Sequence, residues 1–290
     1  MRIAVTGSSG KLGSATVQWL RAAGHEVTGF DRTGTPAADF VQVDLEDYGQ
    51  VLDALIGVTA RHQGLDALVH LAALPVNGLI PDAATFTNNN NATFHVLHGA
   101  LRAGITKVVM ASSITAVGFP TFSQIPLLPV PESYHEANVT YALGKISEEA
   151  VAAQLVRWQE GMRITALRFT NIVGPDDYAD FAQATTTQYR RNLLHSYLDV
   201  RDGAAAVGAA LKRHEPGFNI YNIAAAESSN TIPSAQLAAR NFPGVPVQKD
   251  MGEFEPLFSV RKAKRDLGFT SSYHWRTEYE RCRREQRGTA

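Results

Sequence analysis

The fold of this chain is decided by residues 3–13, which have the sequence IAVTGSSGKLG. A short apolar run leads into three glycines with the spacing GxxGxxG, and a helical pattern begins at once. This order predicts a strand that turns into a helix whose first N–H groups face a phosphate. Gly7 permits the tight turn, Gly10 lets the backbone approach a pyrophosphate, and Gly13 lets the helix lie close to the strand. We expect the intervening loop residues to contact a dinucleotide as well, namely Ser9, Lys11 and Leu12.

The composition of the chain excludes several classes of protein. The chain has 290 residues, a formal net charge of -1 and 44% hydrophobic residues, enough for one large lobe with a smaller one attached. A balanced charge gives no electrostatic footprint for nucleic acid or for an anionic membrane. The apolar stretches are strand-sized, and a strand at Ile3 leaves no room for a secretory leader. The single cysteine, Cys282, fits a reducing cytoplasm.

The first part of the chain alternates apolar strands with amphipathic helices. This alternation predicts an α/β fold with a doubly wound parallel sheet that is covered on both faces. The expected strands are 2–6, 26–31, 40–44, 66–72, 107–112 and 163–169, and the expected helices are 11–23, 48–62, 82–103 and 138–159.

The second part of the chain is less regular. We expect an extended segment at 192–200, strands at 218–223 and 245–248, helices at 202–212, 234–241 and 259–267, and a tail rich in Arg and Glu. No clean linker separates the two parts. The sequence therefore predicts a dinucleotide-binding domain over 1–173 that carries the catalytic residues, and a smaller substrate-binding lobe over 174–290 that is interleaved with it.

Acidic residues end the second and third expected strands. Asp31 is placed to accept hydrogen bonds from the adenosine ribose hydroxyls and to repel a 2′-phosphate, which favours NAD over NADP. Arg32 leaves NADP open, because a guanidinium can hold that phosphate. Asp44 and Leu45 are expected beside the adenine, and the alternative for Asp44 is a helix N-cap.

A phenol and an ammonium group follow much later, at Tyr141 and Lys145. Their i, i+4 spacing places both on one face of a helix. Hydride transfer at a carbinol requires a proton to move at the same oxygen, and a free tyrosine has a pKa of about 10, too high for a base at neutral pH. A lysine one turn away favours the phenolate. The motif YxxxK often occurs by chance on a helix surface. The glycine segment near the start of the chain supports its interpretation as a catalytic pair.

A serine pair ends the strand before this helix. Because strand carboxyl ends line the ligand crevice of a doubly wound sheet, a hydroxyl there is placed to orient the substrate oxygen. We expect Ser113 to have this role and rank Ser112 second; both could simply be turn residues.

Together these segments resemble the extended short-chain dehydrogenase/reductase superfamily, in its NAD-dependent epimerase/dehydratase branch. The resemblance also rests on residues 70–73 (HLAA), on Asn89 with Thr93, and on residues 167–175 (LRFTNIVGP). It implies a Rossmann fold with Ser113 and Tyr141 as catalytic residues, and with Lys145 on the nicotinamide ribose. It further implies cofactor contacts from Leu71, Ala72, Ala73, Asn89, Ala111 and Phe169, and substrate contacts from Ile114 and Asn171.

The substrate is less defined by the sequence. Relatives that act on nucleotide sugars insert a long segment after the Gly-Pro, whereas here roughly two dozen residues join Pro175 to Tyr197. This shortness resembles the uronate dehydrogenase type and implies a small sugar, sugar acid or similar polar substrate. Two departures leave other sugars and polyols open. Ile114-Thr115 replaces the Asn-His of that type, and Ala179 stands where it has an arginine, so Arg190 and Arg191 are candidates for an anion site.

The sequence is compatible with three functions. The first is an NAD-dependent oxidoreductase acting on a carbinol, the second is a sugar or nucleotide-sugar epimerase with tightly held NAD, and the third is a non-catalytic dinucleotide-sensing regulator, which the Tyr/Lys pair disfavours. We expect no metal, because His70 has no second ligand at useful spacing. The resemblance implies a homodimer formed by the helices 82–103 and 138–159.

Overall fold

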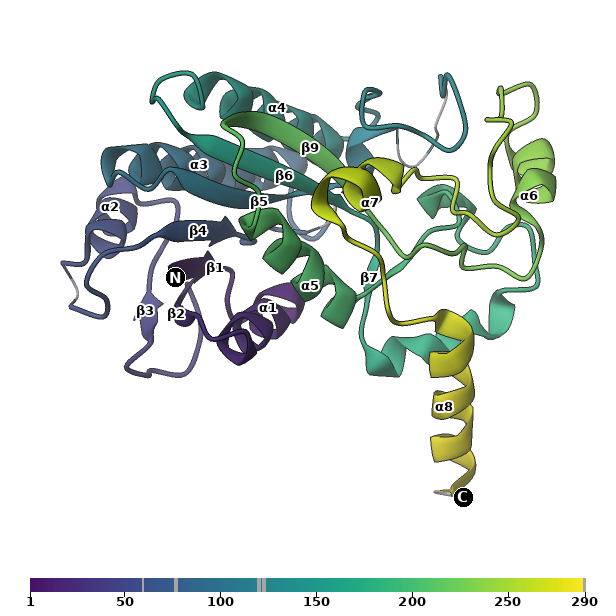
Figure 1. Cartoon of the computed structure of the whole chain (residues 1–290), viewed down its shortest axis with the longest axis horizontal. Coiled ribbons are helices and arrows are strands. Elements are labelled where there is room, and N and C mark those ends of the chain that lie inside the picture. The colour runs from purple at the N-terminus through teal and green to yellow at the C-terminus, as the bar shows by residue number, and fades with distance from the viewer. Residues whose placement is uncertain (59, 76–77, 119–120, 122–123, 289–290) are drawn as a thin grey trace.

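The computed structural model describes residues 1–58, 60–75, 78–118, 121 and 124–288, with side chains through residue 285. Its centre is a parallel sheet of seven strands in the order β3-β2-β1-β4-β5-β6-β9 (Figure 1). The strands are β1 Arg2–Thr6, β2 Glu26–Asp31, β3 Phe40–Gln42, β4 Ala67–His70, β5 Lys107–Ser113, β6 Arg163–Phe169 and β9 Gly217–Ile223. The strand order reverses between β1 and β4, where a doubly wound sheet opens its ligand crevice.

Helices cover both faces of this sheet, so the predicted doubly wound fold is confirmed. On one face lie α1 Lys11–Ala22 and α5 Val200–Leu211, and on the other lie α2 Tyr48–Ile56, α3 Asp82–Arg102 and α4 Thr140–Leu155 (Figure 1). Each strand contributes side chains to the hydrophobic cores on both faces of the sheet, because successive side chains point to opposite faces. Ile3 and Val5 pack under α1 and α5, whereas Ala4 packs with the residues of α2 and α3.

The C-terminal lobe, predicted to bind the substrate, is assembled from short elements. A two-stranded pair joins β7 Ile172–Val173 to β8 Leu198–Asp199, and the 3-10 segments η2 Pro175–Gln183 and η3 Arg191–Leu193 lie between them. Farther along come α6 Ser234–Asn241, α7 Arg261–Leu267 and α8 Trp275–Gly288, the last of which projects from the body (Figure 1). The 3-10 turn η1 Ile114–Ala116 follows β5.

The two parts of the chain interleave. Residues 114–130 of the first part contribute Val117, Leu128 and Val130 to an apolar cluster that also holds Leu237 and Phe258 of the lobe. In return α5, β9 and α7 complete the sheet layer. A division at residue 173 stays a prediction, and residues 289–290 of the predicted lobe lie outside the described part.

Four expected elements differ from the structure. The helix expected over 48–62 ends at Ile56, because Gly57 adopts a left-handed conformation with φ 83°. The strand expected over 245–248 is a single bridge from Val247 to Leu128. The segment 192–200 is largely turn, since Leu194 and His195 are also left-handed. The charged tail forms α8, whose Trp275 is buried.

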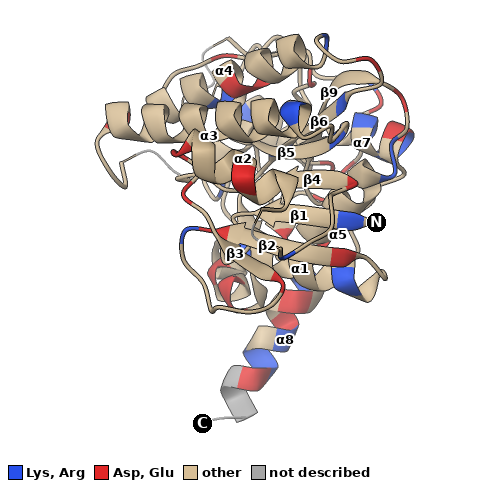
Figure 2. Cartoon of the chain, turned by 90° about the vertical axis from the view of Figure 1, so that its left-hand side faces the viewer, with Lys and Arg blue, Asp and Glu red and all other residues tan. Residues whose placement is uncertain are grey.

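Acidic and basic side chains are interspersed over the surface that Figure 2 presents, including α8, which carries both signs. This mixture agrees with the formal net charge of -1. Within the described part of the chain, no helix combines the length and apolar character needed to cross a membrane.

Candidate functional site

The glycine loop between β1 and α1 forms a cradle for an anion. Gly7 has φ +69°, and a Cβ there would lie 2.7 Å from the backbone nitrogen of Ala72. A Cβ on Gly13 would lie 1.9 Å from the carbonyl oxygen of Gly7, so only glycine lets α1 approach this closely. A Cβ on Gly10 would meet only the Gly7 oxygen, at 3.3 Å, which leaves that side of the loop open. Gly10 caps α1 without a side-chain hydrogen bond, so the first-turn N–H groups have no such acceptor.

A groove of about 300 Å³ opens beside this loop, at the carboxyl ends of β1, β2 and β4. It brings together ten of the residues predicted to bind the cofactor, Gly7, Ser9, Gly10, Asp31, Arg32, Asp44, Leu45, Leu71, Ala72 and Ala73. It also includes residues that the sequence analysis missed, Thr33, Val43, Glu46, Leu74, Asn88 and Ala92. Most of these follow strand ends, which is the signal that could have identified them.

Asp31 is fixed at the rim of this groove by backbone donors. Its Oδ2 accepts a hydrogen bond from the N–H of Ser9 at 2.9 Å, and its Oδ1 accepts one from the N–H of Thr33 at 3.2 Å. The Ser9 hydroxyl donates to the Thr33 carbonyl at 2.5 Å. These bonds tie the glycine loop to the end of β2 and hold the carboxylate where a ribose hydroxyl would reach it. Arg32 is exposed beside Asp31. Its guanidinium is therefore still a candidate to hold the 2′-phosphate of NADP.

The predicted catalytic residues come together between β5 and α4. Tyr141 is 7% exposed, and the Ser113 hydroxyl, which accepts a hydrogen bond from the N–H of Thr115 at 3.1 Å, lies close enough to the Tyr141 phenol to lower its pKa. The Nζ of Lys145 lies 5.7 Å from the centroid of the Tyr141 ring and donates to the carbonyl of Ala111 at 3.4 Å. A hydroxyl, a phenol and an ammonium group therefore share one small, nearly closed space.

The electrostatics of this trio are set by burial and by nearby charges. Burial raises the pKa of Tyr141, and the ammonium of Lys145 and the hydrogen bond from Ser113 offset only part of that rise. Burial opposes the charged form of Lys145, but Glu148, Tyr141 and Glu149 together outweigh it, with Glu148 first among them, and the pKa of Lys145 is raised. Lys145 is thus an ammonium, and further positive charge near the phenol would be needed to make it a base at neutral pH.

Two buried acids of α4 were not anticipated. Glu148 accepts a hydrogen bond from Lys145 at 2.8 Å, and both residues are almost completely buried. Glu149 forms a bidentate ion pair with Arg168 of β6, at 2.8 and 2.7 Å. Spacing from Lys145 was the available signal, but acids at i+3 and i+4 on a helix are usually solvated.

Ser112 does not face the candidate site, which corrects its ranking as a substrate contact. Its hydroxyl donates to Oε1 of Glu149 at 2.6 Å. Ser112 and Ser113 are successive strand residues, so their side chains point to opposite faces of the sheet.

Three other predicted contacts have side chains directed elsewhere. Ile114 is 3% exposed in the apolar cluster of the lobe, and Phe169 packs in the sheet core. Leu12 packs close to Gly203 of α5, so what it offers a ligand is its backbone at the start of α1. The side chains of Ile114 and Phe169 thus pack in apolar clusters, and their contacts with substrate and cofactor stay predictions.

Asn89 and His70 fix the framework around the groove. The Asn89 side chain accepts from the Leu74 N–H at 2.8 Å and donates to the Leu74 carbonyl at 3.0 Å, which holds the loop after β4. His70 is bonded to Thr6 at 2.7 Å and to Thr93 at 3.1 Å, and burial lowers its pKa to about 3. Among the described residues no cluster of His, Cys, Asp or Glu could hold a metal ion.

The substrate side of the site is bounded by Asn171 and Arg190. The Asn171 Oδ1 accepts a hydrogen bond from Nη1 of Arg190 at 2.8 Å, and the guanidinium lies 4.7 Å from the centroid of the Phe181 ring. Asn171 follows β6, whose Phe169 pairs with Ser113 in the sheet. Arg190 therefore stands at the same carboxyl edge of the sheet as Ser113.

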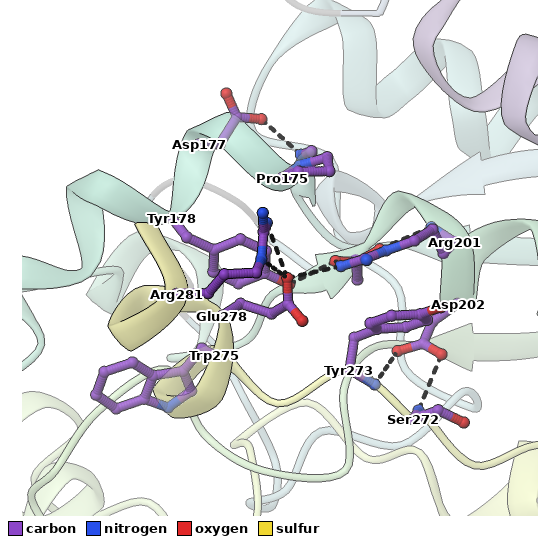
Figure 3. A network of polar contacts seen from close by, with 12 residues as sticks. Pro175, Asp177, Tyr178, Arg201, Asp202, Ser272, Tyr273, Trp275, Glu278 and Arg281 are labelled. Atoms are coloured by element: carbon purple, nitrogen blue, oxygen red, sulfur yellow. Dashed lines mark hydrogen bonds and ion pairs between the residues drawn. The ribbon is translucent and has the colours of Figure 1, made fainter. Parts of the chain in front are cut away.

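One ion pair joins the glycine loop to the lobe. Lys11 donates to Oδ2 of Asp177 at 2.7 Å, and this oxygen also accepts from the N–H of Gly174. The segment that carries Asp177 is anchored by Tyr178, which donates to the buried Asp199 at 2.7 Å. Arg201 pairs with Asp199 and also with Glu278 of α8 (Figure 3).

Known proteins match this chain over most of its length. The NAD dependent epimerase/dehydratase family matches residues 3–224. A UDP-glucose 4-epimerase of Lacticaseibacillus casei is 30% identical over 193 residues, which are 60% of this chain and 52% of that protein. An L-arabinose 1-dehydrogenase (NAD(P)(+)) of Haloferax volcanii is 39% identical over 115 residues, 39% of this chain and 41% of that protein. These matches span about half the length of the two relatives.

Solved structures agree with the fold. A short-chain dehydrogenase/reductase superfamily protein from Agrobacterium tumefaciens, crystallised with bound NAD, superposes with a TM-score of 0.75 at 21% identity. The superposition covers 100% of this chain and 98% of that one. At this identity the likeness establishes the architecture.

Proposed function

The chain belongs to the NAD dependent epimerase/dehydratase family, and from this premise we propose that it is an NAD-dependent oxidoreductase. Its substrate is a small sugar, sugar acid or similar polar molecule, and the reaction takes place at a carbinol carbon. The observation that carries the proposal is the contact of Ser113 with Tyr141, with the Lys145 ammonium beside them. Membership gives NAD as the cofactor, and Asp31 at the rim of the groove supports it over NADP.

The groove and the glycine cradle fit a dinucleotide. The N–H groups at the start of α1 would hold the diphosphate, Asp31 the adenosine ribose, and Lys145 the nicotinamide ribose. When bound, NAD supplies a hydride acceptor and a positively charged ring. The first two contacts come from a helix start and a strand end, whereas Lys145 lies within α4 and is held next to β5 by its bond to the Ala111 carbonyl.

The chain's own residues handle the substrate proton. Ser113 orients the substrate oxygen by donating a hydrogen bond to it, and Tyr141 removes its proton. Tyr141 must be a phenolate before it accepts this proton and becomes a phenol, and Lys145 stabilises that phenolate, because a positive charge next to a phenol favours its ionised form. Burial of the trio strengthens each of these interactions by excluding water.

The lobe supports a small substrate. The segment between Pro175 and Tyr197 folds into the turns η2 and η3 with no extended insertion. Arg190 at the carboxyl edge supports a sugar acid, since its guanidinium is placed next to Asn171 with Nη2 available to a carboxylate. A sugar epimerase with retained NAD is the second candidate, favoured by the match to the epimerase of Lacticaseibacillus casei.

Steady-state turnover distinguishes the candidates. We would incubate the purified protein with NAD and a panel of uronic acids, aldoses and polyols, and follow NADH absorbance. Accumulation of NADH in proportion to substrate supports the oxidoreductase. Interconversion of UDP-glucose and UDP-galactose without net NADH supports the epimerase. Binding of NAD with neither activity on any substrate would leave only the dinucleotide-sensing regulator.

A homodimer formed by α3 and α4 is part of the proposal. These helices lie side by side (Figure 1), and they and the turn after α4 expose Phe94, Leu143 and Trp158 at 42%, 52% and 64%. Such an apolar patch on two long helices suits an isologous contact. Sedimentation equilibrium of the protein and of Trp158→Glu tests it, and a monomer at all concentrations would contradict it. A cytoplasmic location stays a proposal based on the single cysteine, to be tested by cell fractionation.

A further inference from the structure

Lys145 has a buried partner that the proposed chemistry does not use. Glu148 is 1% exposed, and its Oε2 lies 2.8 Å from Nζ of Lys145. Thr93 of α3 lies next to the carboxyl, while Oε1 has no partner of full hydrogen-bond geometry among the described residues. A carboxylate with one orphaned oxygen in a closed site is costly, because burying an unsatisfied charged group is strongly unfavourable.

The neighbouring acid is arranged differently. Glu149 accepts bonds from two nitrogens of Arg168 and from the hydroxyl of Ser112, so both of its oxygens are occupied. Arg168 in turn donates to the backbone carbonyls of Glu132 and Tyr134. This pair joins α4 to β6 and to the loop that precedes α4, and it needs no part in catalysis. Glu148 has no comparable bond to another strand, and its ion pair is with the catalytic lysine.

We propose that Glu148 is a positioning residue, the buried counter-ion that holds the Lys145 ammonium beside the phenol of Tyr141. The inference rests on the proposed function, in which that ammonium stabilises the phenolate. Lys145 is 3% exposed, so its ammonium is not solvated by bulk water and depends on a charged partner within the protein. Removal of one partner of such a pair leaves the other charge buried and unpaired.

The groups around this pair limit what could replace Glu148. Glu149 is paired with Arg168 and raises the pKa of Lys145 less than Glu148 does, and the buried His70 on β4 is uncharged at neutral pH. The remaining direct partner of Nζ is the Ala111 carbonyl, a neutral acceptor. The titratable or charged groups that face the pair from α4, β4 and β6 are Tyr141, Glu149, His70 and Arg168.

Loss of the Glu148 carboxylate should lower the pKa of Lys145. Without the Glu148 carboxylate, burial is the dominant influence on Lys145, and the lysine loses its proton at a lower pH. A neutral amine no longer stabilises the phenolate of Tyr141. Activity should therefore fall on the alkaline side of the pH profile at a pH where the wild-type protein is still active.

Three variants test the inference, Glu148→Gln, Glu148→Asp and the matched control Glu149→Gln. In E148Q we expect the decline of kcat on the alkaline side of the pH profile to begin at a pH lower by about one unit or more. At pH values above this decline, kcat should be roughly tenfold lower than in the wild type. E148D keeps the charge and should recover most of that loss. E149Q also removes a buried carboxylate from α4 but should lower Tm without moving the limb. Profiles of E148Q and E148D that superimpose on the wild type, or an equal shift in E149Q, would overturn the proposal.

A second measurement does not depend on turnover. The Nζ signal of Lys145 in ¹⁵N-lysine-labelled protein, assigned with Lys145→Arg, reports its titration directly. We expect it to titrate at lower pH in E148Q, or partway in E148D if E148Q does not fold. A shifted titration in a protein that oxidises no substrate would refute the proposed function and leave this inference standing. An unchanged titration in every folded Glu148 variant would refute the inference itself.

Discussion

The dinucleotide half of this molecule and its substrate lobe are built by different means. In residues 1–173, site residues lie at the ends of neighbouring parallel strands, as Asp31 ends β2 and Ser113 ends β5. In the lobe, side-chain bonds and left-handed backbone set the positions, with Arg190, Leu194 and His195 all near φ +53°. The first arrangement repeats with every βα unit, whereas the second occurs once.

This difference predicts how substitutions should behave. A change at a strand end in the first half should act on the cofactor or on the chemical step, because the sheet fixes the surrounding backbone. A change in the lobe should act on substrate affinity or on folding, because neighbouring side chains hold each residue in place. Non-glycine residues with positive φ cost of order 1 kcal/mol each, so the surrounding contacts must hold this backbone.

The largest effect is expected from Tyr141→Phe. Loss of the phenol removes the proton acceptor, so turnover should fall by about 10²- to 10⁴-fold while NAD still binds. The measurement is kcat together with the dissociation constant of NAD. Tyr178→Phe is the matched control in the lobe, since its phenol donates to Asp199. That variant should lose stability and keep its chemical step. Full activity in Y141F would remove the distinction between the two halves.

A smaller effect concerns folding of the lobe in acid. His195 is fully buried; its Nδ1–H donates to the Tyr189 carbonyl at 2.9 Å, and its Nε2 accepts from Asn241. Burial lowers its pKa from 6.5 to about 4. Because the unfolded chain binds a proton below pH 6.5 and the folded chain does not, stability should fall from about pH 6.5 toward 4, by about 3 kcal/mol in all.

Denaturant unfolding at a series of pH values measures this loss, and His195→Gln should flatten it. The same substitution should leave NAD affinity unchanged, because His195 belongs to the lobe. His70→Gln offers the contrast, since His70 is bonded to Thr6 beside the glycine loop and should affect NAD binding as well. An equally steep pH dependence in H195Q would show that the acid sensitivity lies elsewhere.

The same contrast explains what the sequence could predict. The strands 2–6, 26–31 and 163–169 were predicted to the residue, because strands buried on both faces appear as continuous apolar runs. The cofactor groove followed, since its residues lie next to those strands. Ser112 was misplaced although strand alternation allows only one residue of the pair to face the site.

Long-range side-chain partners were not predictable. Glu148 lies on a helix face that the sequence gives no reason to bury, and it is buried where α3 packs against α4. The bonds from Arg190 to Asn171 and from Lys11 to Asp177 connect residues 19 and 166 positions apart. For α8 a signal existed, because Trp275, Glu278 and Cys282 are buried at helical spacing, but the surrounding charges obscured it.

A moderate effect is expected from Arg190→Gln in the lobe. A charged hydrogen bond to substrate is lost, so KM for an acidic sugar should rise about tenfold, ~1.4 kcal/mol, with little change in kcat. Arg191→Gln is the control, because Arg191 donates to the Asn241 carbonyl and lies over Phe242. KM for a neutral aldose should change less in R190Q. An equal rise for acidic and neutral sugars would assign Arg190 to folding of the lobe and not to recognition.

The smallest effect belongs to the contact that crosses between the halves. Lys11 and Asp177 are 56% and 41% exposed, and exposed ion pairs contribute about 0–1 kcal/mol. Asp177→Asn should therefore lower the free energy of unfolding by less than about 1 kcal/mol. It also frees Lys11 at the start of α1, where an anion is expected, so NAD should bind up to about fivefold more tightly at low salt and less so at high salt. Calorimetric titration at two salt concentrations, with Asp176→Asn as the control, measures both changes. Weaker binding in D177N would mean that the lobe positions Lys11 for the diphosphate, and the two halves would then share the cofactor site.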